Sequence, residues 1–364
     1  MCFDINCDTI LIMKHETSPN QGCEFNLKKE YSPTPGIVDI LKGEISELQK
    51  TKSQKNGSKN QEVEVRIVEK GPGMIDLNDW KDNKEWSGIF NHVLLCARYA
   101  SYFAEELSKK GHNIDPQTVL DAMLVSHTGR RQWDEANWYP EIAPNSAEKR
   151  SKPNEQLGLE LIKDKVQDNV YNLVAALGYE KEKCPVEPKV YDTLEYKIAS
   201  YVDHRTTGKY EPLNVRMGNF VLQNFLDKDK INPELKEKVY GSVQEIINND
   251  MSFEEADKVL SDLGAPENSP RLPRKILARM IVNDANTEKF LQSKGVNTEI
   301  NDDLVPMPKW EDELRKRYVL AAKEEIIENK ETILKNSESD KDNWWNKYVE
   351  KYFDEIKNER TNLY

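Results

Sequence analysis

The chain has 364 residues, and 52 lysines and arginines stand against 64 aspartates and glutamates, which gives a formal net charge of −12. This length allows two domains or one domain with large additions, and the negative charge disfavours a general binder of nucleic acid or anionic membranes. No run of about eighteen apolar residues is present, and the apolar run at 9–13 is too short for a signal-peptide core. We therefore expect a cytoplasmic protein without a transmembrane helix.

The cysteines do not indicate a disulfide framework, because the chain has only 5 of them and their spacing is irregular. Cys2, Cys7 and Cys23 could belong to a zinc site. Without a CxxC pair, free thiols in a loose N-terminal arm are the favoured interpretation.

Residues 1–75 are interpreted as an N-terminal arm that contains a flexible linker and a short β element. The linker is the polar, lysine-rich stretch at 51–61. In EVEVRIV at 62–68, apolar and charged residues alternate, which is typical of a half-buried strand. A second short strand at 9–13 could pair with it.

The region 76–265 is expected to form one helical domain, so the predicted fold class is all-α. The pattern predicts helices at 84–109, 115–126, 155–177, 190–205, 213–227, 232–249 and 252–262. The second of these helices begins at Asp115-Pro116, a favourable pair for an N-cap and a first turn. Gly129 stands where a helix stop is common.

Residues 266–364 are expected to form a helical C-terminal extension, which begins at the proline-rich stretch 266–275. Near its end Trp345, Val349, Tyr352 and Ile356 form a narrow apolar stripe. We favour docking of this stripe on the protein's own core. Contact with a protein partner, or self-association through this extension, is the alternative.

Three polar residues interrupt the apolar faces of three predicted helices: His92, His127 and Asp203. A buried polar group costs free energy unless it is bonded. A single inward histidine is usually a core residue bonded to a backbone carbonyl, but three such residues suggest one shared polar site. Imidazole and carboxylate are ligands that divalent transition metals prefer, so manganese, iron, cobalt or zinc could bind there.

The order and context of these residues resemble the HD superfamily of metal-dependent phosphohydrolases. The resemblance covers about 84–250 and is carried by NHVLLCARYASYFAEEL around His92, LDAMLVSHTGRRQW around His127 and YKIASYVDHR around Asp203. It implies an orthogonally packed helical bundle, metal binding by these three residues, and hydrolysis of phosphate monoesters or diesters, mostly of nucleotides.

Thr128 departs from the family pattern, which has an aspartate directly after the second histidine. Without that carboxylate the ligands carry −1 beside a dication, and we expect metal binding to weaken by about two orders of magnitude. Arg130 and Arg131 are candidates for phosphate binding, with a solvated loop as the plainer interpretation. The extra histidines of two-metal members are missing from 128–202. We therefore expect a single metal, with His204 at the rim.

The sequence thus predicts a single-metal phosphohydrolase of the HD type that acts on a small phosphate or nucleotide substrate and is weakened by Thr128. The alternative is a catalytically degenerate HD-like domain that binds a nucleotide or a protein partner without turnover. A third possibility is a structural role in which His92 and His127 are bonded core residues. No carboxylate stands out as a general base, and no extended nucleic acid or membrane partner is expected.

Overall fold

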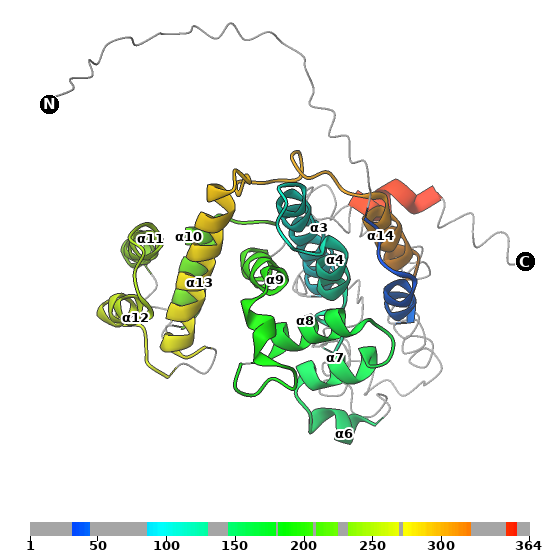
Figure 1. The fold of residues 1–364 in the computed structure, drawn as a ribbon, viewed down its shortest axis with the longest axis horizontal. Coiled ribbons are helices and arrows are strands. Elements are labelled where there is room, and N and C mark those ends of the chain that lie inside the picture. The colour runs from blue at the N-terminus through cyan, green and yellow to red at the C-terminus, as the bar shows by residue number, and fades with distance from the viewer. Residues whose placement is uncertain are drawn as a thin grey trace, which may run out of the picture. The chain divides into compact units, whose positions relative to one another are not determined.

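The computed structural model describes residues 31–43, 86–129, 145–179, 181–206, 209–224, 232–268, 272–321 and 347–354. Within these ranges the chain is helical (Figure 1), and its only β pairing there is an isolated bridge between Thr206 and Tyr210. The predicted all-α class is therefore confirmed for this part of the chain. The strands expected at 9–13 and 62–68 lie outside the described residues.

The helices follow one another through mostly short connections. After a helix at 35–43 come α3 (Trp86–Lys109), α4 (Pro116–Val125), α6 (Ser146–Arg150), α7 (Asn154–Ile162), α8 (Asp168–Gly178), the 3-10 helix η2 (Pro188–Asp192), α9 (Leu194–Arg205), α10 (Leu213–Asn224), α11 (Pro233–Asn248), α12 (Phe253–Asp262), α13 (Arg274–Ser293), α14 (Lys309–Ala321) and a helix at 347–354. Four of the helices, α4, α9, α11 and α12, begin at a side-chain cap that accepts a backbone N–H, supplied by Asp115, Thr193, Asn232 and Ser252.

The prediction of one helix at 155–177 is wrong. The structure has two helices in this region, α7 and α8, joined by a turn. Lys163 leaves the helical conformation, and Asp164 has a left-handed φ of 62°. The turn lets Ile162 and Leu173 enter the same apolar core from two helices. It also lies tightly against Gly36, where a Cβ would come within 2.7 Å of the Lys165 carbonyl oxygen.

The buried apolar side chains form two clusters. The first draws on α3, α4, α7, α8 and α9, together with the helix at 35–43 and residues from 291–314. The second draws on α10 to α13 and includes both Ala265 and Leu277, so the packing does not follow the predicted boundary at 265/266. Helix α9 packs against α3, α4 and α8 and also against α10 and α13, and it thereby links the two clusters. The division into domains at 75/76 and 265/266 stays a prediction.

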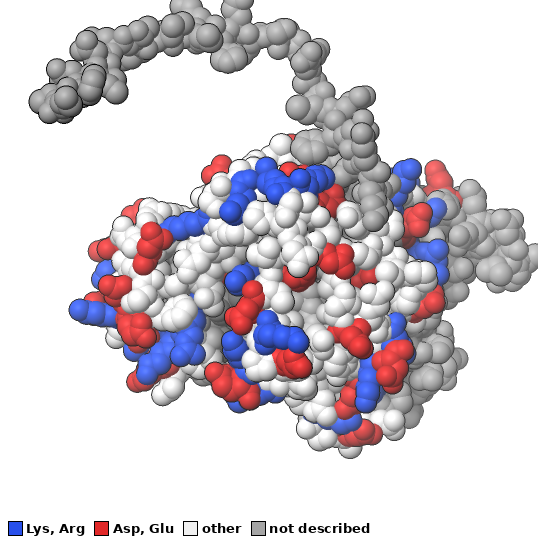
Figure 2. Space-filling view, viewed as in Figure 1, with Lys and Arg blue, Asp and Glu red and all other residues white. Residues whose placement is uncertain are grey.

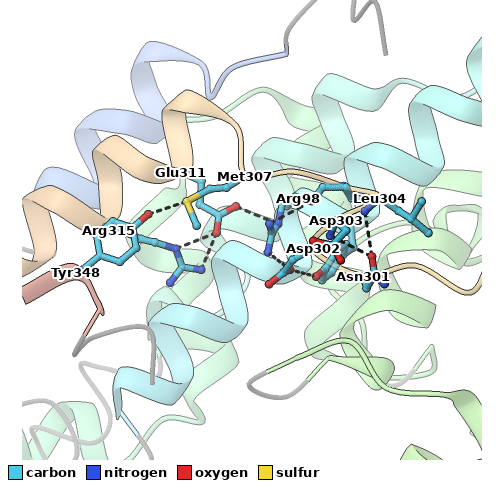
Figure 3. A network of polar contacts seen from close by, with 11 residues as sticks. Arg98, Asn301, Asp302, Asp303, Leu304, Met307, Glu311, Arg315 and Tyr348 are labelled. Atoms are coloured by element: carbon cyan, nitrogen blue, oxygen red, sulfur yellow. Dashed lines mark hydrogen bonds and ion pairs between the residues drawn. The ribbon is translucent and has the colours of Figure 1, made fainter. Parts of the chain in front are cut away.

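A network of buried charges connects α14 to α3 (Figure 3). Glu311 is completely buried, with Oε2 3.2 Å from Arg98 Nε and Oε1 accepting from Arg315 Nε at 2.9 Å. Arg98 also donates to the Val305 carbonyl and to the Asp302 carboxylate. A buried carboxylate between two buried guanidinium groups is stable only while all three charges are present. The network therefore fixes α14 and the segment before it beside α3.

The helix at 347–354, which carries two residues of the predicted apolar stripe, packs against α14 of the same chain. Val349 is buried, and the Tyr352 hydroxyl donates to Asp312 of α14 at 2.9 Å. The other two residues of the stripe, Trp345 and Ile356, lie outside the described residues.

Two surface properties bear on possible partners. Basic and acidic side chains are interspersed over the described part of the face shown in Figure 2. No helix among the described residues combines the length and the apolar character needed to cross a membrane.

Candidate metal centre

The three residues predicted as metal ligands lie together, although they come from distant parts of the sequence. His92 is on α3, His127 follows Ser126, the C-cap residue of α4, and Asp203 is in the last turn of α9. One ligand atom from each lies within 4.8 Å of the other two. Asp203 Oδ1 is 3.0 Å from His92 Nε2 and 4.0 Å from His127 Nε2. Packing of α3 on α4, and of α9 on both, produces this cluster.

The cluster is sheltered but accessible to solvent. The side chains of His92, His127 and Asp203 are 17%, 33% and 30% exposed. The two imidazole rings meet edge to face, with centroids 5.0 Å apart and an interplanar angle of 73°. Solvent therefore reaches part of each of the three side chains.

Hydrogen bonds fix the orientation of both histidine rings. His92 Nδ1 lies 3.1 Å from the Thr206 carbonyl oxygen, which can only accept, so this nitrogen carries a proton. Ser126 donates its single hydroxyl proton to the Met123 carbonyl and therefore accepts from His127 Nδ1, at 2.8 Å. In each ring Nε2 is left to face Asp203. Such a bond from the other ring nitrogen is the usual support of a metal-binding histidine.

The charges of the cluster are strongly coupled. Burial lowers the pKa of His92, but the Cys96 sulfur and the Asp203 carboxylate raise it more, and the net pKa lies well above the ordinary 6.5. Burial raises the pKa of Asp203, but the hydrogen bond and charge of His92, with the charges of His127 and His204, hold it well below its ordinary range. Asp203 is therefore ionised at neutral pH, and His92 must release a proton to bind a cation.

Thr128 is buried where α4 ends against α7. Its hydroxyl donates to the Val125 carbonyl at 3.0 Å, and Oγ1 lies 3.6 Å from the position of a Cβ on Gly158. Its single proton is thus used inside the helical turn. Gly129 is not a left-handed helix stop, which corrects our expectation. A Cβ there would lie 2.0 Å from the Asn154 carbonyl oxygen, so glycine is required for close contact with α7.

His204, which we expected at the rim, is not one of the cluster's residues. His204 Nδ1 lies 2.9 Å from the Asp284 carboxylate on α13, so its ring is paired there. Arg130 and Arg131 lie outside the described residues.

Three residues that support or adjoin the cluster were missed. Ser126 directly precedes His127, so its role as a partner of the ring could have been considered from the sequence. Thr206 acts through its carbonyl, which any residue would supply, and its side chain gives no signal. Arg216 on α10 donates to the His204 carbonyl, one residue beyond Asp203, and this contact depends on how the chain folds after α9.

Comparison with protein-family models, with curated proteins and with solved structures finds no match for this chain. A link to the HD superfamily therefore depends on the residues and their geometry.

Proposed function

We propose that His92, His127 and Asp203 hold one divalent transition metal ion and that the protein hydrolyses a small phosphate compound, such as a nucleotide, in the manner of an HD-type phosphohydrolase. The observation that supports this most is the shared orientation of the two histidine rings. Both rings present Nε2 to the same carboxylate, and both have Nδ1 held by an acceptor.

The ligand atoms fit manganese, iron, cobalt or zinc. Two imidazole nitrogens and one carboxylate oxygen are a common set for these ions, and three protein ligands leave positions for water and substrate. The set carries −1, so a dication would leave a net charge of +1. This charge would attract an anionic substrate, whereas the missing second carboxylate weakens retention of the ion.

A divalent ion bound there would lower the pKa of a coordinated water and polarise a phosphoryl oxygen. The protein supplies the orientation. The Thr206 carbonyl and the Ser126 hydroxyl hold the two rings, and Asp203 keeps its charge throughout the neutral pH range. Because His92 loses a proton on binding, metal affinity rises with pH.

The test is phosphate release from a panel of nucleotides and simple phosphate esters, with and without added Mn²⁺. We expect release that depends on the metal and falls by about a hundredfold or more in Asp203→Asn, which removes the only charged ligand. His204→Asn is a matched control from the next position, outside the ligand set. A protein that binds metal but releases phosphate from none of these esters would instead be the degenerate binding domain.

A further inference from the structure

We infer that Arg216 is the phosphate-holding residue of this site and that its terminal guanidinium nitrogens bind the phosphoryl oxygens of an anion seated at the His92–His127–Asp203 cluster. The inference deepens the proposed function, since the location of the anion depends on the proposed metal site.

The connection from α9 to α10 is short and held at several points. Thr206 and Tyr210 form an antiparallel bridge, and the Glu211 amide donates to the Arg205 carbonyl at 3.0 Å. Arg205 Nε in turn donates to the Glu211 carbonyl at 2.8 Å. These bonds hold the start of α10 against the last turn of α9, which carries Asp203.

The Arg216 side chain is fixed within this arrangement. It lies in the first turn of α10, and its Nε donates to the His204 carbonyl at 2.9 Å, one residue beyond Asp203. The guanidinium carbon lies 4.2 Å from the centre of the Phe220 ring. A side chain held at Nε and on one face loses little further freedom when its terminal nitrogens bind an anion.

Arg216 differs from other sheltered arginines in the contacts of its two terminal nitrogens. Arg98, Arg205 and Arg274 each place a terminal nitrogen on a carboxylate. Among the described residues, Arg216 makes no hydrogen bond through Nη1 or Nη2. A planar pair of N–H donors without an acceptor among the described residues suits the oxygens of a phosphoryl group.

The charge around Arg216 supports the same role. Burial lowers the pKa of Arg216, and the nearby carboxylates of Glu211 and Asp203 oppose that change, so the group stays protonated at neutral pH. A bound dication would engage Asp203 and leave the half-buried guanidinium with less negative charge nearby. A phosphoryl anion between the cation and Arg216 would then interact favourably with both.

The experiment measures binding of inorganic phosphate by titration calorimetry, in metal-free protein and in protein loaded with Mn²⁺. The variants are Arg216→Gln and Arg216→Lys, and the matched control is Arg279→Gln, which changes an exposed arginine on α13. Mn²⁺ affinity and the thermal midpoint are measured for each variant, so that loss of the metal or of the fold is detected separately.

We expect Arg216→Gln to weaken phosphate binding by about 10- to 100-fold, with Mn²⁺ affinity changed less than about twofold. Arg216→Lys should recover part of the affinity, and Arg279→Gln should bind as the unaltered protein does. Equal phosphate affinity in Arg216→Gln that still binds Mn²⁺, or no phosphate binding by the unaltered protein, would overturn the inference. Absence of Mn²⁺ binding would refute the proposed function, while an Arg216-dependent affinity in metal-free protein would still support this inference.

Discussion

Replacement of Ser126 by alanine tests whether the orientation of His127 matters for metal binding. The hydroxyl accepts from His127 Nδ1 at 2.8 Å and donates to the Met123 carbonyl at 2.9 Å. Without it the ring loses the bond that selects its tautomer, worth about 1 to 1.5 kcal/mol. That loss corresponds to metal affinity about tenfold weaker. Removal of a hydrogen-bond partner of a metal ligand usually weakens metal binding by about 10- to 100-fold, so this is the lower end of the range. Because Ser126 is half-buried, stability should change by less than about 1 kcal/mol.

The assay is competition for Zn²⁺ or Mn²⁺ against a chromophoric chelator, and Thr128→Val is the matched control. Thr128→Val also removes a hydroxyl, but among the described residues that hydroxyl bonds only the Val125 carbonyl. We expect Thr128→Val to lower the unfolding free energy by about 1 kcal/mol and to leave metal affinity within about twofold. If Ser126→Ala has no effect, or if Thr128→Val weakens metal binding equally, the reasoning about ring orientation is wrong.

Two further predictions concern stability. Glu311→Gln leaves Arg98 and Arg315 buried beside a neutral amide. Urea denaturation at pH 7 should therefore show a free energy of unfolding lower by about 3 to 5 kcal/mol. The control Glu299→Gln, at an exposed position, should change this free energy little. A loss below about 1 kcal/mol for Glu311→Gln would contradict the role of the network. Burial raises the pKa of Glu105 from 4.5 to about 7, so the folded state binds its proton more tightly and loses stability as pH rises through this window. Glu105→Gln cannot ionise, and its stability relative to the unaltered protein should therefore rise by up to about 3 kcal/mol between pH 4 and pH 8. An equal difference at both pH values would be inconsistent with the raised pKa.

The helical class and most helix positions follow from local signals in the sequence. Apolar periodicity and caps such as Asp115 and Ser252 are decided by neighbouring residues. The turn between α7 and α8 could not be predicted in this way. It depends on how both helices reach one core and on a close approach to Gly36, a contact distant in sequence.

The cluster of His92, His127 and Asp203 could be predicted because His92 and Asp203 are polar residues on otherwise apolar helix faces and His127 closely follows an apolar helix. The groups that hold or adjoin the cluster could not be predicted as readily. A backbone carbonyl such as that of Thr206 has no signature in the sequence. Arg216 reaches the His204 carbonyl, next to Asp203, only because the connection between α9 and α10 is short.

The most direct test of the central claim is the metal content of the purified protein by mass spectrometry, after incubation with manganese, iron or zinc. His127→Ala is compared with His112→Ala, which removes a histidine that packs against Phe290 away from the cluster. We predict about one equivalent of metal in the unaltered protein and in His112→Ala, and loss of that metal in His127→Ala. No metal in any of the three proteins, or equal metal in His127→Ala, would contradict a metal centre at this site.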